Sequence, residues 1–206
     1  MNARGINTAN MEKILLGHGS GGRLMHKLIR DLFLKHFDNP ALRAMGDSAV
    51  LNYARGKLAF TTDSFVVKPL FFPGGDIGKL AVCGTVNDLV VSGFRPLCLS
   101  CAMIIEEGFD YKKLERITKS LAAAASLAGV SIVTGDLKVV EHSSCDGLFI
   151  NTSGIGVAAG GSDLAVSRIR PADKIIVTGP IGEHGIAVLS KRKELDFDFN
   201  LKSDCA

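Results

Sequence analysis

Apolar residues recur with helical spacing in several stretches of this chain. Two adjacent apolar rows at i, i+4 spacing run from Leu24 to Phe37, directly after a glycine-rich loop, and predict an amphipathic helix. Asp76 is a suitable N-cap for a second helix that ends at Gly93. A third stretch carries an apolar stripe that closes at Gly129. The predicted helices cover residues 24–37, 77–92, 114–128 and 184–191.

Shorter runs of apolar and β-branched residues lie between these helices and predict strands. The first two runs are separated by a turn at 54–56, and the proline- and glycine-containing segment 71–76 is expected to be a loop. The predicted strands are 48–52, 57–62, 96–105, 130–134, 148–158 and 173–177.

Cys98 and Cys101 have C-x-x-C spacing but fall inside the predicted strand 96–105. Positions three apart on a strand point to opposite faces, so these two thiols are poorly placed to share a metal or to pair. We therefore expect two small core residues.

Gly160, Gly161 and Ser162 indicate a domain boundary, which divides the chain into residues 1–160 and 161–206. The strand and helix predicted after this boundary open a second unit. Roughly 40 residues cannot build an independent core. We therefore expect residues 161–206 to be a linker and the shortened beginning of a second domain.

The composition is that of an ordinary globular protein, with 47% hydrophobic and 22% charged residues among 206. A net charge of +3, with no run of Lys or Arg that forms a patch, argues against nucleic-acid binding. The polar segment 1–12 does not resemble a signal peptide, and no window reaches the length of a membrane span. Five irregularly spaced cysteines do not form a disulfide framework, so we expect a cytoplasmic protein.

A glycine-rich loop, Gly17-His18-Gly19-Ser20-Gly21-Gly22, leads into the first predicted helix. Glycine allows close approach of backbone N–H groups to phosphate oxygens, and a helix N-terminus favours an anion. This loop is therefore a candidate phosphate site. His18 has two interpretations, a phosphate contact or a structural role.

Four separated aspartates, Asp47, Asp63, Asp88 and Asp136, stand in turns, at strand ends or within an apolar helix. Their carboxylate oxygens suit Mg²⁺, which prefers hard ligands and keeps several waters. The alternative for each is a helix cap or a turn. Asp88 is the hardest to explain that way, because a carboxylate in an apolar helix needs a compensating cation or donors.

Lys138 follows Asp136 by two residues, so both side chains lie on one side of an extended segment. The lysine can hold a phosphate or polarise an oxyanion, or it can simply pair with Asp136. His142 follows in a loop, where it either moves protons or is merely solvated. For His184, at the head of the last unit, we infer no mechanism beyond a contact between domains.

Together, the motifs of this chain resemble the HypE family of hydrogenase maturation proteins. The glycine loop, the aspartates and Asn87-Asp88 alone resemble a wider superfamily that includes aminoimidazole ribonucleotide synthetase, selenophosphate synthetase and thiamine-monophosphate kinase. The segments 69–75 and 135–140 narrow the resemblance to HypE, and it covers essentially the whole chain. The matching segments are 17–22, 61–65, 69–75, 87–93, 99–101, 133–140, 149–152 and 203–206.

The resemblance implies an α/β (α+β) fold: a PurM-like N-terminal domain with a mixed sheet flanked by helices, plus the start of a second α+β domain. It also implies a homodimer that pairs the two sheets, with ATP and Mg²⁺ bound in a cleft near the interface. The implied reaction dehydrates a carboxamide on the protein's own C-terminal cysteine to a thiocyanate, which supplies cyanide to the iron of NiFe hydrogenase. The implied partners are a carbamoyltransferase and scaffold proteins of hydrogenase maturation.

Matching to the family motif assigns roles to single residues. Lys138 takes the catalytic lysine position, and His142 is a candidate base. The chain departs from the family at Leu137, where a threonine is usual, and at Gly46, where an acidic residue is frequent. The implied nucleotide positions are His18, Gly19, Ser20, Gly21, Gly22, Asp63, Asn87 and Asp136, and the implied metal positions are Asp47, Asp63, Asp88 and Asp136.

Two alternatives stay open. Selenophosphate synthetase carries a reactive Cys or selenocysteine just before the glycine loop, whereas this chain has no cysteine before Cys83. The other alternative is a non-catalytic domain that dimerises or binds maturation partners. Cys205 matches an internal segment of the family and is not expected to carry the carboxamide, so the chain alone is expected to be inactive.

Overall fold

A computed structural model describes residues 22–53, 56–160, 164–193 and 201–205. The chain forms two compact units, residues 1–45 and residues 46–206. The division at residue 160 expected from the sequence stays a prediction.

The described part of the first unit is helical, as predicted for residues 24–37. Its main helix comprises α1 (Arg23–Leu28), a π-helical turn (Ile29–Phe33) and α2 (Leu34–Phe37), and α3 (Pro40–Arg43) follows. The predicted i, i+4 stripe is visible in the stacking of Phe33 on Phe37, with ring centroids 6.3 Å apart.

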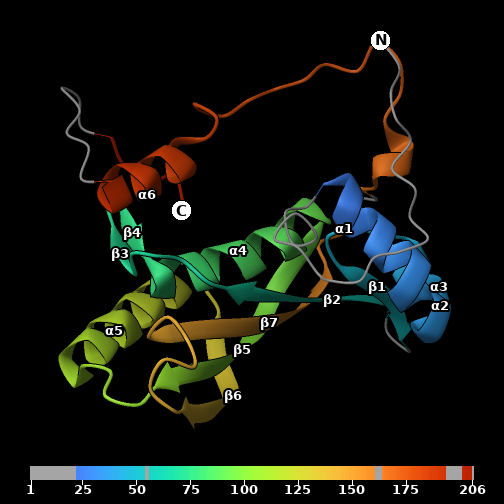
Figure 1. Cartoon of the computed structure of the whole chain (residues 1–206). Helices are drawn as coiled ribbons and strands as arrows, with labels where there is room; N and C mark the ends of the chain where they lie inside the picture. The colour runs from blue at the N-terminus through green and yellow to red at the C-terminus, as the bar shows by residue number, and fades with distance from the viewer. Residues whose placement is uncertain (1–21, 54–55, 161–163, 194–200, 206) are drawn as a thin grey trace, which may run out of the picture. The chain divides into compact units, whose positions relative to one another are not determined.

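The second unit is built on a five-stranded mixed sheet in the order β1-β2-β7-β5-β6 (Figure 1). Only β5 and β6 pair in parallel; the other neighbours are antiparallel. This arrangement confirms the predicted mixed α/β fold. The strands are β1 (Ala49–Tyr53), β2 (Gly56–Phe65), β5 (Phe94–Glu106), β6 (Ser131–Val140) and β7 (Leu148–Ala158).

Two helices, α4 (Ile77–Val91) and α5 (Tyr111–Leu127), cover one face of this sheet (Figure 1). The predicted N-cap is confirmed, because Asp76 Oδ1 accepts hydrogen bonds from the backbone N–H groups of Gly78 and Lys79. The core lies between these helices and the sheet, and none of the described helices of the second unit covers the opposite face. The largest fully buried apolar side chains are Ile77, Leu89, Leu99, Ile117, Leu148, Ile150 and Val82.

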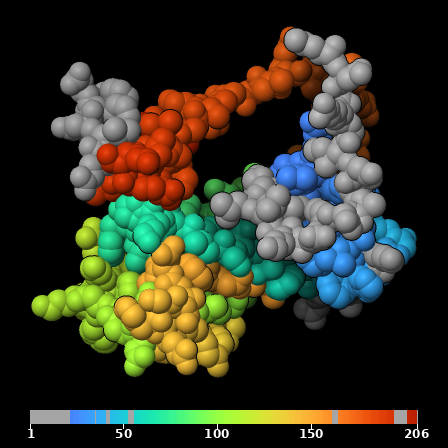
Figure 2. All heavy atoms as spheres, viewed as in Figure 1, coloured from blue at the N-terminus to red at the C-terminus, as the bar shows by residue number. Residues whose placement is uncertain are grey.

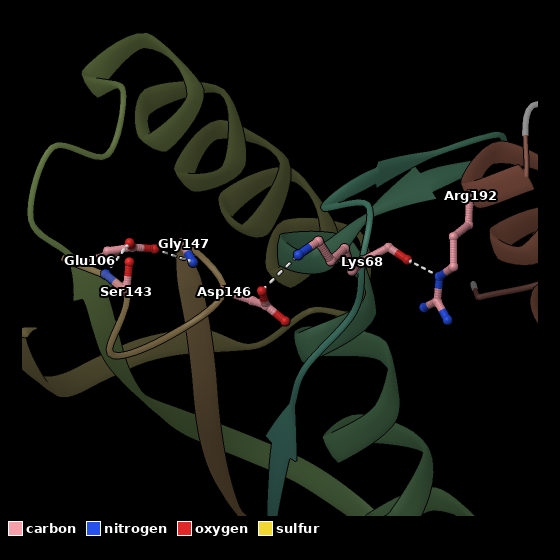
Figure 3. A network of polar contacts seen from close by, with 6 residues as sticks. All are labelled: Lys68, Glu106, Ser143, Asp146, Gly147 and Arg192. Carbon is pink, nitrogen blue, oxygen red and sulfur yellow. Dashed lines mark hydrogen bonds and ion pairs between the residues drawn. The ribbon is translucent and has the colours of Figure 1, made fainter.

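The last described helix, α6 (Glu183–Lys193), packs on a two-stranded ladder of β3 (Phe71–Phe72) and β4 (Gly75–Asp76), where a loop was predicted. Figure 3 shows a second attachment, in which Arg192 Nε donates to the Lys68 carbonyl oxygen at 2.8 Å. The ammonium of Lys68 also pairs with Asp146 in the β6–β7 loop at 2.7 Å.

The strand predicted at residues 173–177 is wrong. The structure shows no strand there, and Ile175 and Ile176 are 93% and 85% exposed. An isolated strand leaves its backbone groups and its apolar side chains unpaired, and none of the described residues pairs with this segment.

The expectation for the two cysteines on β5 is met only in part, because both are half-buried and only Cys101 packs against the described core. Cys98 lies opposite Ile155 and Cys101 lies opposite Thr152, three positions apart on β7, so the thiols point to opposite faces. Both are free. None of the described helices combines the length and the apolar character that a membrane span requires.

The close packing of α4 against α5 gives a stability prediction. A Cβ atom at Gly78 would lie 2.5 Å from the Ile117 carbonyl oxygen on α5. Gly78→Ala should therefore lower the free energy of unfolding by about 1–3 kcal/mol, because overpacking outweighs the gain in helix propensity. Gly185→Ala on α6, where no atom lies within 4 Å, is the matched control in urea denaturation. A Gly78→Ala protein as stable as wild type would contradict the packing.

Candidate functional site

Three of the four predicted aspartates come together beside α4. Asp47 precedes β1, Asp63 lies on β2 and Asp88 lies in the last turns of α4. Since β1 pairs with β2, the Asp47 turn lies next to the middle of β2. We call Asp47, Asp63 and Asp88 the aspartate cluster.

Gly84 allows α4 to approach β2 closely enough to form this cluster. A Cβ atom there would lie 2.8 Å from the Phe65 ring and 3.6 Å from Asp63 Oδ2. A side chain at this position would require the Phe65 ring or the helix to shift. The glycine therefore permits the close approach of the strand that carries Asp63 and the helix that carries Asp88.

Thr61, which was not predicted as a site residue, links the cluster. Its Oγ1 lies 2.8 Å from Asp88 Oδ2 and 3.0 Å from the carbonyl oxygen of Asp47. Strand alternation was the signal that could have found it, because residues 61 and 63 of one strand share a face. Thr61 is buried, at 6% exposure.

The cluster concentrates negative charge in a partly buried place. Burial raises the pKa of Asp63, and the charge of Asp47 raises it further, whereas a hydrogen bond with Asp88 lowers it. Burial also raises the pKa of Asp88, against the hydrogen bond from Thr61, and the neighbouring charges of Asp63 and Asp47 add to the rise. A bound cation would relieve this crowding.

The carboxylates of the aspartate cluster suit a cation that also keeps water or phosphate oxygens as ligands. Among the described residues, no group of three or more His, Cys, Asp or Glu side chains is placed to hold a metal ion by itself, so the aspartate cluster would need ligands from elsewhere. Mg²⁺ is typically held by one or two carboxylates, with waters and substrate phosphates completing its shell. Ser48 Oγ, beside Asp47, is buried without a hydrogen-bond partner in the described chain, so a donor also stands free there.

Asp136 and Lys138 lie away from this cluster within one chain. The register runs from Asp63 to Thr152 on β7, Cys101 on β5 and Gly135 on β6. Three strand spacings make about 14 Å. Asp136, the residue after Gly135, points to the opposite face, as does Lys138 two positions later.

His142 lies in the loop after β6, where its Nδ1 is 3.2 Å from Glu106 Oε1 and its side chain is 81% exposed. Figure 3 shows what Glu106 does in this loop: it accepts hydrogen bonds from the backbone N–H groups of Ser143 and Gly147, at 2.7 and 2.9 Å. These hydrogen bonds hold the pKa of Glu106 below its usual value. His142 therefore contacts Glu106, the residue that anchors this loop through two backbone hydrogen bonds.

The remaining predicted positions are Asn87 and the glycine loop. Asn87 is exposed and lines a groove of about 350 Å³ between α4 and α5, with Lys79 and Cys83. Gly22 is the N-cap residue of α1 in the first unit. His18, Gly19, Ser20 and Gly21 lie outside the described residues.

His184 is tied to the end of the described chain. Its Nδ1 is 2.9 Å from Ser203 Oγ, its backbone N–H donates to Asp204, and its ring meets Phe72 edge-on at 5.2 Å. These contacts attach α6 to residues 203–205 and to β3. The space-filling view of Figure 2 shows α6 seated on the β3–β4 region.

Asn151 is a second residue that the sequence did not predict for the site. Its side-chain amide donates to the carbonyl oxygen of Asp63 at 2.9 Å and to Ser64 Oγ at 3.0 Å. These bonds cross from β7 to β2 on the face opposite the helices. Asn151 therefore fixes the backbone that carries Asp63.

Comparison with known proteins places this site in a family. Residues 45–158 match the family described as AIR synthase related protein, N-terminal domain. A carbamoyl dehydratase HypE from Rhizobium leguminosarum bv. viciae is 52% identical over 203 residues, which cover 98% of this chain and 58% of that relative.

Two solved structures are similar over most of this chain. A HypE–HypF complex has a TM-score of 0.80 and 55% identity, covering 86% of this chain and 57% of the other. A HypE structure in complex with ATP has a TM-score of 0.70 and 53% identity, covering 94% and 58%. The chain thus spans a little under three fifths of the length of these relatives. The resemblance to HypE is confirmed, and the chain belongs to the AIR synthase-related family, whose N-terminal domain it carries.

Proposed function

We propose that this chain is the nucleotide-binding part of an ATP-dependent carbamoyl dehydratase that serves the maturation of NiFe hydrogenase. The observation that carries the proposal is the aspartate cluster, in which Thr61 links Asp88 to the Asp47 backbone. Similarity to HypE, including a HypE that binds ATP, supports the choice of nucleotide.

The proposed reaction converts a protein thiocarbamate, R–S–CO–NH₂, to a thiocyanate, R–S–CN, on a C-terminal cysteine. An amide oxygen is a poor leaving group, so ATP first transfers its γ-phosphoryl group to it. The oxygen then departs as phosphate when the nitrogen loses its protons. ATP is thereby hydrolysed in effect to ADP and phosphate, and the two protons pass to bases.

The proposed roles of the residues follow from their chemistry. The aspartate cluster would hold Mg²⁺, which neutralises charge on the nucleotide phosphates when bound. The glycine loop at 17–22 would bind phosphate through its N–H groups, and Lys138 would neutralise the transferring phosphoryl group. His142 would be the base that accepts a proton. Asn87 stays a predicted nucleotide contact.

We also propose a homodimer. Asp136 and Lys138 lie three strands away from the aspartate cluster of their own chain, so they can serve the same reaction only at the cluster of a second copy. Both side chains belong to the face of the sheet that has no described helix over it, where Ile104 and Ile155 are 42% and 39% exposed. Because the cluster faces α4, the aspartate cluster of a second copy would reach Asp136 around an edge of the paired sheets. The interface would be isologous, with the same surface on both copies.

The proposed partners are a carbamoyltransferase, which would deliver the carboxamide, and scaffold proteins, which would receive the cyanide. The solved HypE–HypF complex supports the first of these. This chain covers 57% of the matched chain in that complex, so the partner surface need not lie in residues 1–206.

Calorimetry of ATP with Mg²⁺ tests the proposed site. Asp88→Asn should weaken binding by about 10- to 100-fold, because it removes a carboxylate from the metal position. Asp110→Asn is the matched control, since Asn still caps α5 and the residue lies outside the cluster. Equal binding by wild type and Asp88→Asn would remove the basis of the proposal.

The crowded carboxylates also predict a pH-dependent stability. Because the pKa of Asp63 is raised in the folded protein, folding favours its protonated form. This stabilising contribution is complete below the unfolded pKa of about 4 and is lost as the pH rises through the folded pKa.

Asp63→Asn should therefore be more stable than wild type at pH 7, and the difference should shrink towards pH 4. Urea denaturation between these pH values, in EDTA, measures it. Saturating Mg²⁺ and ATP should reverse the order at pH 7, since the variant lacks a ligand. A stability difference that does not change with pH would argue against charge crowding.

A further inference from the structure

Thr61 stands where three elements of the site meet. It lies on β2, its side chain faces α4, and its hydroxyl also reaches the turn before β1. The 2.8 Å contact is with Asp88 Oδ2, and the 3.0 Å contact is with the carbonyl oxygen of Asp47. Both distances are those of O–H···O hydrogen bonds.

The single proton of the Thr61 hydroxyl is shared between the Asp88 carboxylate and the Asp47 carbonyl oxygen. A threonine hydroxyl has one proton to donate, whereas a backbone carbonyl and an ionised carboxylate only accept. The hydroxyl therefore serves one oxygen at a time, and the ionised carboxylate of Asp88 is the stronger acceptor. In the alternative orientation of the hydroxyl, the Asp47 carbonyl oxygen accepts the same proton.

The neighbourhood offers little to replace Thr61. Asp63 adds charge close to Asp88, and burial disfavours the ionised form of both. Ser48 Oγ, next to Asp47 in the sequence, makes no hydrogen bond to Asp88 or to any other described residue. Removing the Thr61 hydroxyl would leave the buried side of Asp88 without this donor.

We propose that Thr61 is a positioning residue, whose hydroxyl holds the Asp88 carboxylate and the Asp47 backbone in the relative position that binding of Mg²⁺ and ATP requires. The inference rests on the proposed function of the cluster. In this proposal Thr61 does not contact ATP, and it acts on binding only by positioning Asp88 and Asp47.

Two substitutions separate the hydroxyl from the shape of the side chain. Thr61→Val keeps the branched shape and removes the hydroxyl, and Thr61→Ser keeps the hydroxyl. Thr118→Val is the matched control, because it removes a hydroxyl that donates to a backbone carbonyl on α5, away from the cluster. Calorimetry with Mg²⁺ and ATP on the full chain should give a loss of about 10- to 100-fold for Thr61→Val and near wild-type binding for the other two.

A second measurement tests the link without nucleotide. Amide hydrogen exchange of the peptide spanning residues 46–53 should be faster in Thr61→Val than in wild type, and unchanged in Thr61→Ser and Thr118→Val. If Thr61→Val does not fold, Thr61→Ala takes its place in both measurements.

The outcomes distinguish this inference from the proposed function. Wild-type binding by Thr61→Val, while Asp88→Asn binds weakly, would overturn the positioning role alone. Faster exchange with unchanged affinity would likewise overturn it, because the link would then be only structural. Tight binding by Asp88→Asn as well would overturn the proposed site itself.

Discussion

The close approach of α4 to β2 is the constraint on which the rest of the site depends. It brings Asp88, from a helix, against Asp63 and Thr61, from a strand, and it is possible because Gly84 has no side chain to meet Phe65. Burial of the helix against the sheet supplies the driving force. The aspartate cluster is thus a product of core packing, and its geometry is as rigid as that core.

The cluster has a cost in stability that its proposed function explains. Two of its carboxylates have raised pKa values because they are partly buried and near like charges. A protein selected only for stability would avoid this arrangement. The hydrogen bond from Thr61, and Asn151 on the other face, keep the crowded residues in place.

The elements of the fold were largely predictable from local pattern. The helices at 77–92 and 114–128 follow from apolar spacing, and the N-cap Asp76 follows from residue type. The strand at 173–177 failed because a strand depends on a neighbour that the pattern of one segment does not reveal.

The candidate site was predictable in residue type but not in arrangement. Carboxylates at turns and strand ends indicated a metal, yet their distribution depends on the strand order β1-β2-β7-β5-β6, which is a non-local property. That order sets Asp136 three strands away from Asp63, on the other face. Thr61 was missed because a threonine in a strand is common and carries no chemical signal by itself.

We propose that the aspartate cluster is part of an ATP site that a second copy completes with Asp136. Mixing two variants, Asp88→Asn and Asp136→Asn, tests it directly by calorimetry with ATP and Mg²⁺. Each variant alone should bind weakly, whereas random mixed dimers should regain tight binding at about a quarter of the sites, because one site of each mixed dimer is intact. A mixture that binds no better than its components would contradict the claim.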